Sequence, residues 1–143
     1  MSLTQAQQQD LVAQATAVRE NAYAPYSNYW VGAALLATDG RVFTGCNIEN
    51  AAYSPTLCAE RGAFAQAVSQ GYTQFSGIAV AGWPANASAG SATPCGVCRQ
   101  FMKEFFADDV PILVARPNGT FDTYTLGELL PQGFGPDNLS NTF

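Results

Sequence analysis

Two short cysteine motifs constrain the fold of this chain more than any other feature. Cys58 stands at the start of one predicted helix, and the segment Pro94-Cys95-Gly96-Val97-Cys98 starts another. Proline suits the first position of a helix, and the exposed amide groups and dipole at a helix N-terminus stabilise a thiolate. Gathering the three thiols at one point requires a fold in which two helix N-termini face each other. The chain contains no histidine, so a metal held there would be bound through sulfur.

The four cysteines allow several kinds of site. Zinc binds cysteine sulfur, and three protein ligands plus a water molecule form the pattern of a catalytic site. A structural site would recruit Cys46 as fourth ligand, but Cys46 lies in a predicted strand without a paired thiol. A redox C-x-x-C pair is a further alternative, although the early βα unit typical of thioredoxin-like proteins is absent. We favour zinc bound by Cys58, Cys95 and Cys98, with Cys46 as a small buried residue or a bystander near the site.

Length and charge restrict the class of protein. The chain has 143 residues, 48% hydrophobic and only 12% charged, which predicts a single domain spanning residues 1–143 with some apolar surface covered by another subunit. A net charge of −5 and scattered basic residues argue against a nucleic-acid partner. No apolar run approaches the roughly 20 residues that span a bilayer, and the polar N-terminal segment does not resemble a signal peptide. We therefore predict a cytoplasmic protein without a membrane partner, in which disulfides are not expected.

Hydrophobic periodicity predicts the element order α-β-β-α-β-α-β-β. Helices are predicted over residues 4–23, 58–70 and 95–106, and strands over residues 30–37, 41–48, 78–82, 110–115 and 120–126. This order predicts an α/β fold, a three-layer α/β/α sandwich around a five-stranded mixed sheet.

Local signals support these boundaries. Thr4 and Gln7 form a capping box, and Asp39-Gly40 marks a hairpin between the first two strands. The first helix carries an apolar stripe made of Leu11, Ala15, Val18 and Ala22. The third predicted helix places Val97, Phe101 and Phe105 on one face.

Glu60 lies two positions after a predicted ligand, on the first turn of the same helix. One interpretation is an ordinary glutamate that favours the helix dipole. The other is a general acid/base that acts on a water molecule activated by zinc. Two arginines follow the ligands, Arg61 one turn after Cys58 and Arg99 directly after Cys98. A guanidinium that donates to thiolate sulfur would offset the excess negative charge of a three-cysteine site, whereas the alternative is a solvated surface arginine.

The cysteine motifs also carry a family resemblance. Cys58-Ala59-Glu60, followed by Pro94-Cys95-x-x-Cys98, resembles the zinc-dependent nucleobase deaminase signature, with cysteine in place of the more familiar histidine. Longer segments resemble the small homotetrameric cytidine deaminases over nearly the whole chain: AYAPYSNYWVGAAL (22–35), GCNIENAAYSPTLCAERGAF (45–64), PCGVCRQ (94–100) and LLPQGFGPDNL (129–139).

The resemblance implies a cytidine deaminase-like fold and a homotetramer with shared active sites. It implies one Zn2+ per subunit, held by Cys58, Cys95 and Cys98. Glu60 would be the proton shuttle, and Arg61 would offset the charge of the thiolates.

The resemblance also implies residues that bind a nucleoside substrate. Asn47 and Glu49 would hold the ribose 3′-hydroxyl, while the backbone of Ala59 and the carbonyl next to the Pro94-Cys95 turn would read the pyrimidine edge. Phe134 would stack on the base from a neighbouring subunit, and Tyr53 would lie near the 5′-hydroxyl from another.

Two positions depart from the family pattern. Tyr29 stands where the family usually has phenylalanine against the base, and Gly62 stands where threonine is common. Neither is a predicted ligand, so they bear on the substrate range.

The implied reaction is hydrolytic deamination of cytidine and deoxycytidine, as in pyrimidine salvage. Glu60 would take a proton from the water that attacks C4, protonate ring N3, and then carry a proton to the leaving amino group. The nearest alternative is a deaminase of the same fold that acts on a modified cytosine nucleoside of the blasticidin type. A polynucleotide deaminase is disfavoured by the acidic charge. A non-catalytic zinc-stabilised module would instead require four-sulfur coordination that includes Cys46.

Overall fold

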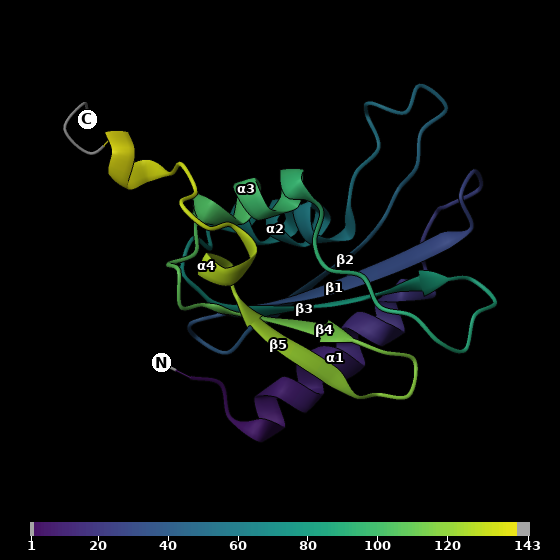
Figure 1. The fold of residues 1–143 in the computed structure, drawn as a ribbon, viewed down its shortest axis with the longest axis horizontal. Coiled ribbons are helices and arrows are strands. Elements are labelled where there is room, and N and C mark those ends of the chain that lie inside the picture. Colours follow the sequence, from purple (N-terminus) through teal and green to yellow (C-terminus); the bar gives the residue numbers. More distant parts are fainter. Residues whose placement is uncertain (1, 140–143) are drawn as a thin grey trace.

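A five-stranded mixed sheet forms the centre of the structure (Figure 1), a computed structural model that describes residues 2–139. Residues 1 and 140–143, which the predicted domain includes, lie outside the described residues. The elements are α1 (Gln5–Arg19), β1 (Tyr29–Ala37), β2 (Val42–Cys46), α2 (Ala59–Ser69), β3 (Phe75–Pro84), α3 (Gly96–Lys103), β4 (Pro111–Ala115), β5 (Phe121–Thr125), α4 (Leu126–Leu129) and the 3-10 helix η1 (Pro136–Leu139). The predicted order of helices and strands is confirmed, with the short α4 and η1 added after the last strand.

The strands are arranged in the order β2-β1-β3-β4-β5. β3 and β4 are parallel, and the other neighbouring strands are antiparallel. β1 and β2 form the predicted hairpin, with Ala34 opposite Thr44 and with Gly40 in the turn at φ +96°. A positive φ is available to glycine at little cost, which explains the Asp-Gly signal in the sequence.

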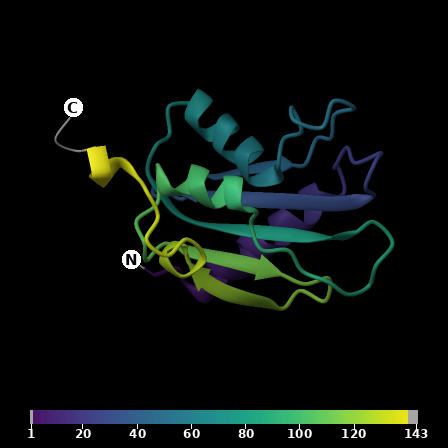
Figure 2. The same cartoon turned by 45° about the horizontal axis from the view of Figure 1, so that its top comes forward.

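Helices cover both faces of the sheet (Figure 2). α1 lies against one face, and α2 and α3 lie against the other. Side chains alternate along each strand, so neighbouring residues enter different cores. The core under α2 and α3 contains Leu35, Phe43, Ile78, Ile112, Phe64 and Met102, and the core under α1 contains Leu11, Val12, Ala34, Leu36, Ala79 and Leu113. The predicted three-layer α/β/α sandwich is therefore confirmed.

Two glycines let the helices approach the sheet closely. A Cβ atom on Gly32 would lie 2.1 Å from the Ala15 carbonyl oxygen of α1. A Cβ atom on Gly45 would lie 2.5 Å from the Ala59 carbonyl oxygen at the start of α2. Since no side-chain rotation can relieve a clash with backbone, Gly45 fixes how closely the first turn of α2 packs on β2.

The first helix differs from its predicted boundaries. It ends at Arg19 rather than at residue 23, and its buried residues are Leu11, Val12, Ala15 and Arg19. Val18 and Ala22 of the predicted stripe are only partly buried. The buried Arg19 guanidinium donates hydrogen bonds to the carbonyl oxygens of Trp30 (3.0 Å), Trp83 (2.8 Å) and Pro84 (3.0 Å). The Arg19 guanidinium can be buried because these carbonyls at the strand ends accept hydrogen bonds from its N–H groups.

The third helix is also shorter than predicted. It buries Cys98 and Met102, whereas Val97 and Phe101 of the predicted apolar face are exposed and Phe105 lies beyond its last residue. None of the helices within residues 2–139 combines the length and the apolar character needed to cross a bilayer.

Candidate active site

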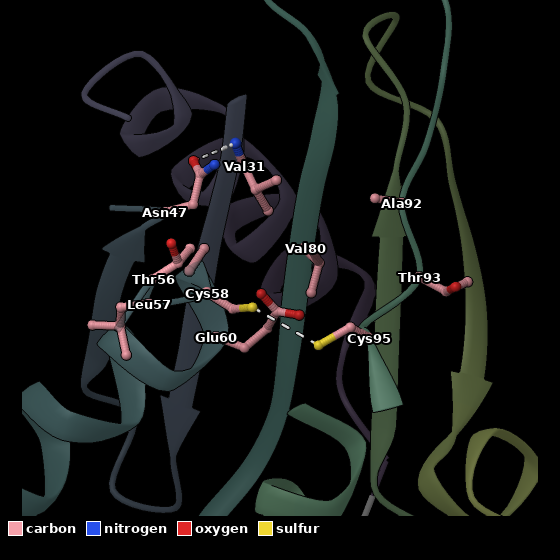
Figure 3. A pocket seen from close by; sticks show the side chains of 11 residues that line it. Val31, Asn47, Thr56, Leu57, Cys58, Glu60, Val80, Ala92, Thr93 and Cys95 are labelled. Carbon is pink, nitrogen blue, oxygen red and sulfur yellow. Dashed lines mark hydrogen bonds between the residues drawn. The ribbon is translucent and has the colours of Figure 1, made fainter. Parts of the chain in front are cut away.

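Helices α2 and α3 begin at the same place above the sheet. Cys58 is the N-cap residue of α2, Cys95 is the N-cap residue of α3, and Cys98 lies in the first turn of α3. The Sγ atoms of Cys58 and Cys95 are 3.8 Å apart (Figure 3), and those of Cys95 and Cys98 are 3.6 Å apart. All three sulfur atoms lie within 4.8 Å of one another. The two helix N-termini thus meet as the sequence predicts.

The sulfur positions fit a zinc ion. Zn–S bonds of about 2.3 Å in a tetrahedron place sulfur atoms roughly 3.8 Å apart. Cys98 is buried, Cys58 is half-buried and Cys95 is exposed, so the cluster opens on one side. Cys46 lies outside this group, and burial raises the pKa of its thiol. The arrangement corresponds to three protein ligands with an open position, the pattern of catalytic zinc.

The cluster stabilises a thiolate before any metal binds. A hydrogen bond from the Cys98 thiol, supported by Arg61, lowers the pKa of Cys58 to about 5. The same bond raises the pKa of Cys98. The Nη2 atom of Arg61 lies 3.3 Å from the Cys58 sulfur. Arg61 therefore binds the Cys58 sulfur through Nη2 and leaves its buried Nε–H unpaired among the described residues.

Glu60 lies beside the sulfur atoms on the first turn of α2. Its side chain is 4% exposed, and burial raises its pKa to about 7, with the charge of the Cys58 thiolate adding to the shift. Burial destabilises the charged form of a carboxyl group when no cation compensates it. A carboxyl group with a pKa near neutrality can accept a proton in one step and donate it in the next.

Arg99 does not contact the sulfur atoms. Its guanidinium donates hydrogen bonds to the carbonyl oxygens of Pro94 (2.6 Å) and Leu129 (2.8 Å) and to the Thr93 hydroxyl (3.0 Å). Of the two arginines considered from the sequence, only Arg61 lies in position to offset thiolate charge.

A pocket extends from the sulfur atoms along β1 and β3 (Figure 3). Its walls are formed by Val31, Asn47, Thr56, Leu57, Cys58, Ala59, Glu60, Val80, Ala92, Thr93 and Cys95. Val31, Thr56, Leu57, Val80 and Ala92 were not predicted as site residues. Strand alternation places Val31 and Val80 on the face of α2 and α3, but the small-residue loop that holds Ala92 gives no such signal.

Asn47 is held rigidly at the edge of this pocket. Its Nδ2 atom donates to the Tyr29 carbonyl oxygen (2.8 Å), and its Oδ1 atom accepts from the Val31 amide (2.9 Å). A carboxamide has two N–H donors and two acceptor lone pairs. One N–H and one lone pair of Asn47 therefore remain for a ligand.

Glu49 and Tyr53 line a neighbouring hollow instead. This hollow is formed by Tyr26, Ser27, Glu49, Asn50, Tyr53 and Thr56, and only Thr56 also lines the pocket described above. The Glu49 carboxylate accepts from the Ser27 hydroxyl and from the amides of Tyr26 (2.9 Å) and Ser27 (3.1 Å). These bonds, the Ser27 hydroxyl foremost, lower the pKa of Glu49. Tyr53 has a positive φ of 65° and is 73% exposed.

Tyr29 and Phe134 line neither hollow. The Tyr29 hydroxyl donates to the Gly82 carbonyl oxygen (3.3 Å), which fixes its ring against β3. Phe134 is 57% exposed, and its carbonyl oxygen accepts from Gln100 Nε2 (2.8 Å) of α3. Within one chain, the structure therefore brings together the three cysteines, Glu60, Arg61, Ala59 and Asn47, but not Glu49, Tyr53, Tyr29 or Phe134.

Known proteins share both the sequence and the fold of this chain. Residues 5–114 match the family model described as the cytidine and deoxycytidylate deaminase zinc-binding region. A cytidine deaminase of Sporosarcina psychrophila is 45% identical over 130 residues, which cover 91% of this chain and 93% of that protein. A cytidine deaminase of Halalkalibacterium halodurans is 41% identical and covers 93% of this chain and 98% of its own length.

Solved structures agree with the sequence comparison. The crystal structure of cytidine deaminase from Burkholderia pseudomallei has a TM-score of 0.81 and 42% identity, and covers 92% of this chain and 100% of that chain. The crystal structure of cytidine deaminase from Mycobacterium tuberculosis has a TM-score of 0.74 and 39% identity, and covers 88% and 95% of the two chains. With three thiols at zinc spacing beside a buried glutamate, and with relatives that match it over nearly its whole length, this chain belongs to the cytidine and deoxycytidylate deaminase family.

Proposed function

We propose that this protein is a zinc-dependent hydrolase that converts cytidine and deoxycytidine to uridine and deoxyuridine with release of ammonia. The observation that carries the proposal is the meeting of Cys58, Cys95 and Cys98 at zinc spacing beside buried Glu60, in a pocket lined by Asn47. Named relatives that act on cytidine support the choice of substrate. Pyrimidine salvage is the corresponding cellular role.

The proton transfers fall to Glu60. Zinc, when bound, supplies the Lewis acidity that makes a water molecule nucleophilic near neutral pH. Glu60 takes a proton from the water that attacks C4 and delivers it to ring N3. It then carries a second proton from the attacking oxygen to the amino group, which leaves as ammonia. A pKa of about 7 suits both directions of transfer.

The pyrimidine edge would be read by backbone groups. Ala59 lies in the first turn of α2, and the first bond within that helix is donated by Gly62 to the Cys58 carbonyl. The Ala59 amide is thus one of the N–H groups that a helix leaves for other acceptors. Next to the Pro94-Cys95 turn, the Pro94 carbonyl already accepts from Arg99. We therefore assign the 4-amino group to the Thr93 carbonyl, which accepts no hydrogen bond from any of the residues 2–139.

The remaining substrate contacts would come from a homotetramer with shared sites. Tyr53 and Phe134 are large exposed aromatic side chains, and the C-terminal segment with Phe134 ahead of η1 leads away from the sheet (Figure 1). An aromatic residue exposed in this way suits a base that needs a stacking partner. In this arrangement Phe134 stacks on the base in a neighbouring subunit, Tyr53 lies near the 5′-hydroxyl of another, and Asn47 and Glu49 hold the 3′-hydroxyl. Tyr29 lies next to Val31 of the pocket and would contact the edge of the base.

Two further proposals concern the chain as a whole. We take residues 1–143 as a single deaminase domain, because the pocket draws on elements from β1 to the loop before α3. A cytoplasmic location is supported by four free cysteines, which a reducing compartment preserves.

An ammonia-release assay tests the proposed reaction. Zinc-loaded protein should release ammonia from cytidine, and removal of the metal by a chelator should abolish the release until zinc is added back. Zinc-loaded protein that releases no ammonia from cytidine or deoxycytidine would exclude the proposed function.

The zinc coordination separates a catalytic from a structural site. X-ray absorption spectroscopy should find three sulfur ligands and one nitrogen or oxygen ligand on the zinc. Four sulfur ligands would require Cys46 and would indicate a non-catalytic zinc module.

A further inference from the structure

Arg99 connects two segments that are distant in the sequence. Its Nε–H and its two terminal nitrogens each donate to a different acceptor: the Pro94 carbonyl, the Thr93 hydroxyl and the Leu129 carbonyl. All three acceptors are uncharged. A planar guanidinium can donate in three directions at once, whereas a lysine ammonium on its flexible stem cannot reproduce this fork.

The first two acceptors belong to the wall of the pocket. Thr93 lines the pocket, and Pro94 is fully buried immediately before the ligand Cys95. Figure 3 shows the Thr93 side chain pointing away from Glu60. The segment that precedes Thr93 is rich in alanine, serine and glycine, so little else in its sequence restrains it.

The third acceptor ties this wall to the C-terminal segment. Leu129 is the last residue of α4, and Phe134 follows five positions later. The residue next to Arg99 holds that end too, since Gln100 donates to the Phe134 carbonyl. Arg99 and Gln100 therefore hold residues 129–134 against α3, but only Arg99 also contacts the pocket wall.

We propose that Arg99 is a positioning residue for substrate recognition, which fixes the Thr93-Pro94 segment so that the Thr93 carbonyl meets the 4-amino group of the pyrimidine. This inference rests on the proposed function. It assigns Arg99 a role in selecting the amino substituent, separate from the role of Arg61 beside the sulfur atoms. Without the three hydrogen bonds from Arg99, the Thr93-Pro94 segment is no longer held in one orientation.

The test compares two ligands that differ only at the 4 position. One is cytidine, and the other is the ribonucleoside of pyrimidin-2-one, which has hydrogen in place of the 4-amino group. Arg99→Met should lower kcat/KM for cytidine about 10- to 100-fold, the range expected when one hydrogen bond to substrate is misplaced. The inhibition constant of the pyrimidin-2-one nucleoside should change by less than about threefold, because that ligand has no amino group to position. Arg99→Lys should follow Arg99→Met rather than the wild type.

Two matched variants separate a specific role of Arg99 from the loss of any arginine and from the loss of the contact between α3 and the C-terminal segment. Arg116→Met removes an arginine that pairs with Asp122 near the turn between β4 and β5, and both ligands should behave as with wild type. Gln100→Met loses only the bond to the Phe134 carbonyl, so any loss should be the same for both ligands.

The outcomes distinguish this inference from the proposed function. Wild-type protein must first deaminate cytidine; if it does not, the proposed function fails and the inference with it. If wild type is active, an equal effect of Arg99→Met on both ligands, or no effect, overturns the role of Arg99 alone. If Arg99→Met loses zinc or unfolds, the same comparison of the two ligands is made with Thr93→Val. That substitution removes only the hydroxyl acceptor, and an unchanged ratio between the two ligands would then overturn the inference.

Discussion

At the scale of single residues, the proposed chemistry depends on Glu60 being buried next to a thiolate. The first turn of a helix ordinarily favours an ionised glutamate. Here burial outweighs that preference and raises the pKa of Glu60 to about 7. Replacing the carboxyl group by an isosteric amide removes the proton carrier and leaves the shape of the pocket unchanged.

We expect Glu60→Gln to fold and to bind zinc as the wild type does, but to lose at least about 10³-fold in kcat for cytidine. Loss of ultraviolet absorbance by cytidine measures the rate, and metal analysis confirms that zinc is retained. Turnover within a few-fold of wild type would exclude Glu60 as the proton carrier.

Arg61 contacts the Cys58 sulfur, which supports the proposal that it offsets thiolate charge. Its guanidinium lies 3.3 Å from the Cys58 sulfur and helps to lower the pKa of that thiol. We expect Arg61→Gln to reduce zinc affinity or activity roughly 10- to 100-fold, because the excess charge of three thiolates is no longer offset. Competition with a chelator measures the affinity, and Arg116→Gln is the matched control. Unchanged zinc affinity together with unchanged kcat would contradict this role.

At the scale of elements, the position of α2 on β2 determines where Cys58 and Glu60 lie, because both belong to the start of α2. A Cβ atom on Gly45 would come within 2.5 Å of the Ala59 carbonyl oxygen and of the Ala63 nitrogen. A Cβ atom on Gly62, at the same helix–strand contact, would meet nothing closer than 3.7 Å. Replacement of these two glycines by alanine should therefore have opposite effects on the free energy of unfolding.

Gly45→Ala should lower the free energy of unfolding by about 3 kcal/mol and reduce activity, because α2 must move away from β2. Gly62→Ala should raise the free energy of unfolding by roughly 0.5–1 kcal/mol, because alanine is the better helix former and fits without a clash. Thermal unfolding at equal protein and zinc concentrations measures both. Equal stability of the two variants would show that the close approach at Gly45 is not required.

At the scale of the whole molecule, the pocket of one chain is lined by Cys58, Cys95 and Glu60 but not by Phe134. A shared site makes a specific prediction about mixed assemblies. Glu60→Gln subunits lack the proposed proton carrier, and Phe134→Ala subunits lack the proposed stacking ring, whose loss should raise KM about 10-fold or more.

Co-expression of these two subunits in equal amounts should restore activity, because about a quarter of the shared sites then combine an intact Glu60 with an intact Phe134. Light scattering should give the mass of a tetramer for wild type and for the mixture. Activity equal to the average of the two separate variants would instead place Phe134 and Glu60 of each site on one chain.

Local patterns in the sequence predicted most of the elements because their causes are local. The capping box of Thr4 and Gln7 is present, α2 ends at Ser69 with Gly71 two residues later at φ +90°, and the Asp-Gly hairpin forms as expected. The errors occurred where a distant partner changes the local preference. Arg19 is buried because carbonyls of β1 and β3 accept from it, and the apolar Val97 remains exposed because Cys98 and Met102 take the core-facing positions of α3.

The sequence by itself predicted the zinc ligands, because residue type and placement at helix N-termini set the chemistry of Cys58, Cys95 and Cys98. The assignment of Glu60 as proton carrier, which its place on the helix alone left open, rested on the family resemblance. Only the tertiary structure decided the partners of Arg99, whereas the family resemblance had already implied the role of Arg61. Both follow a ligand in the sequence, but Arg61 reaches the Cys58 sulfur while Arg99 joins the pocket wall to the segment that leads to Phe134. The physical reason is that a guanidinium donates to whichever acceptors the fold brings within hydrogen-bond distance, and for Arg99 these come from Leu129 as well as from its own helix start.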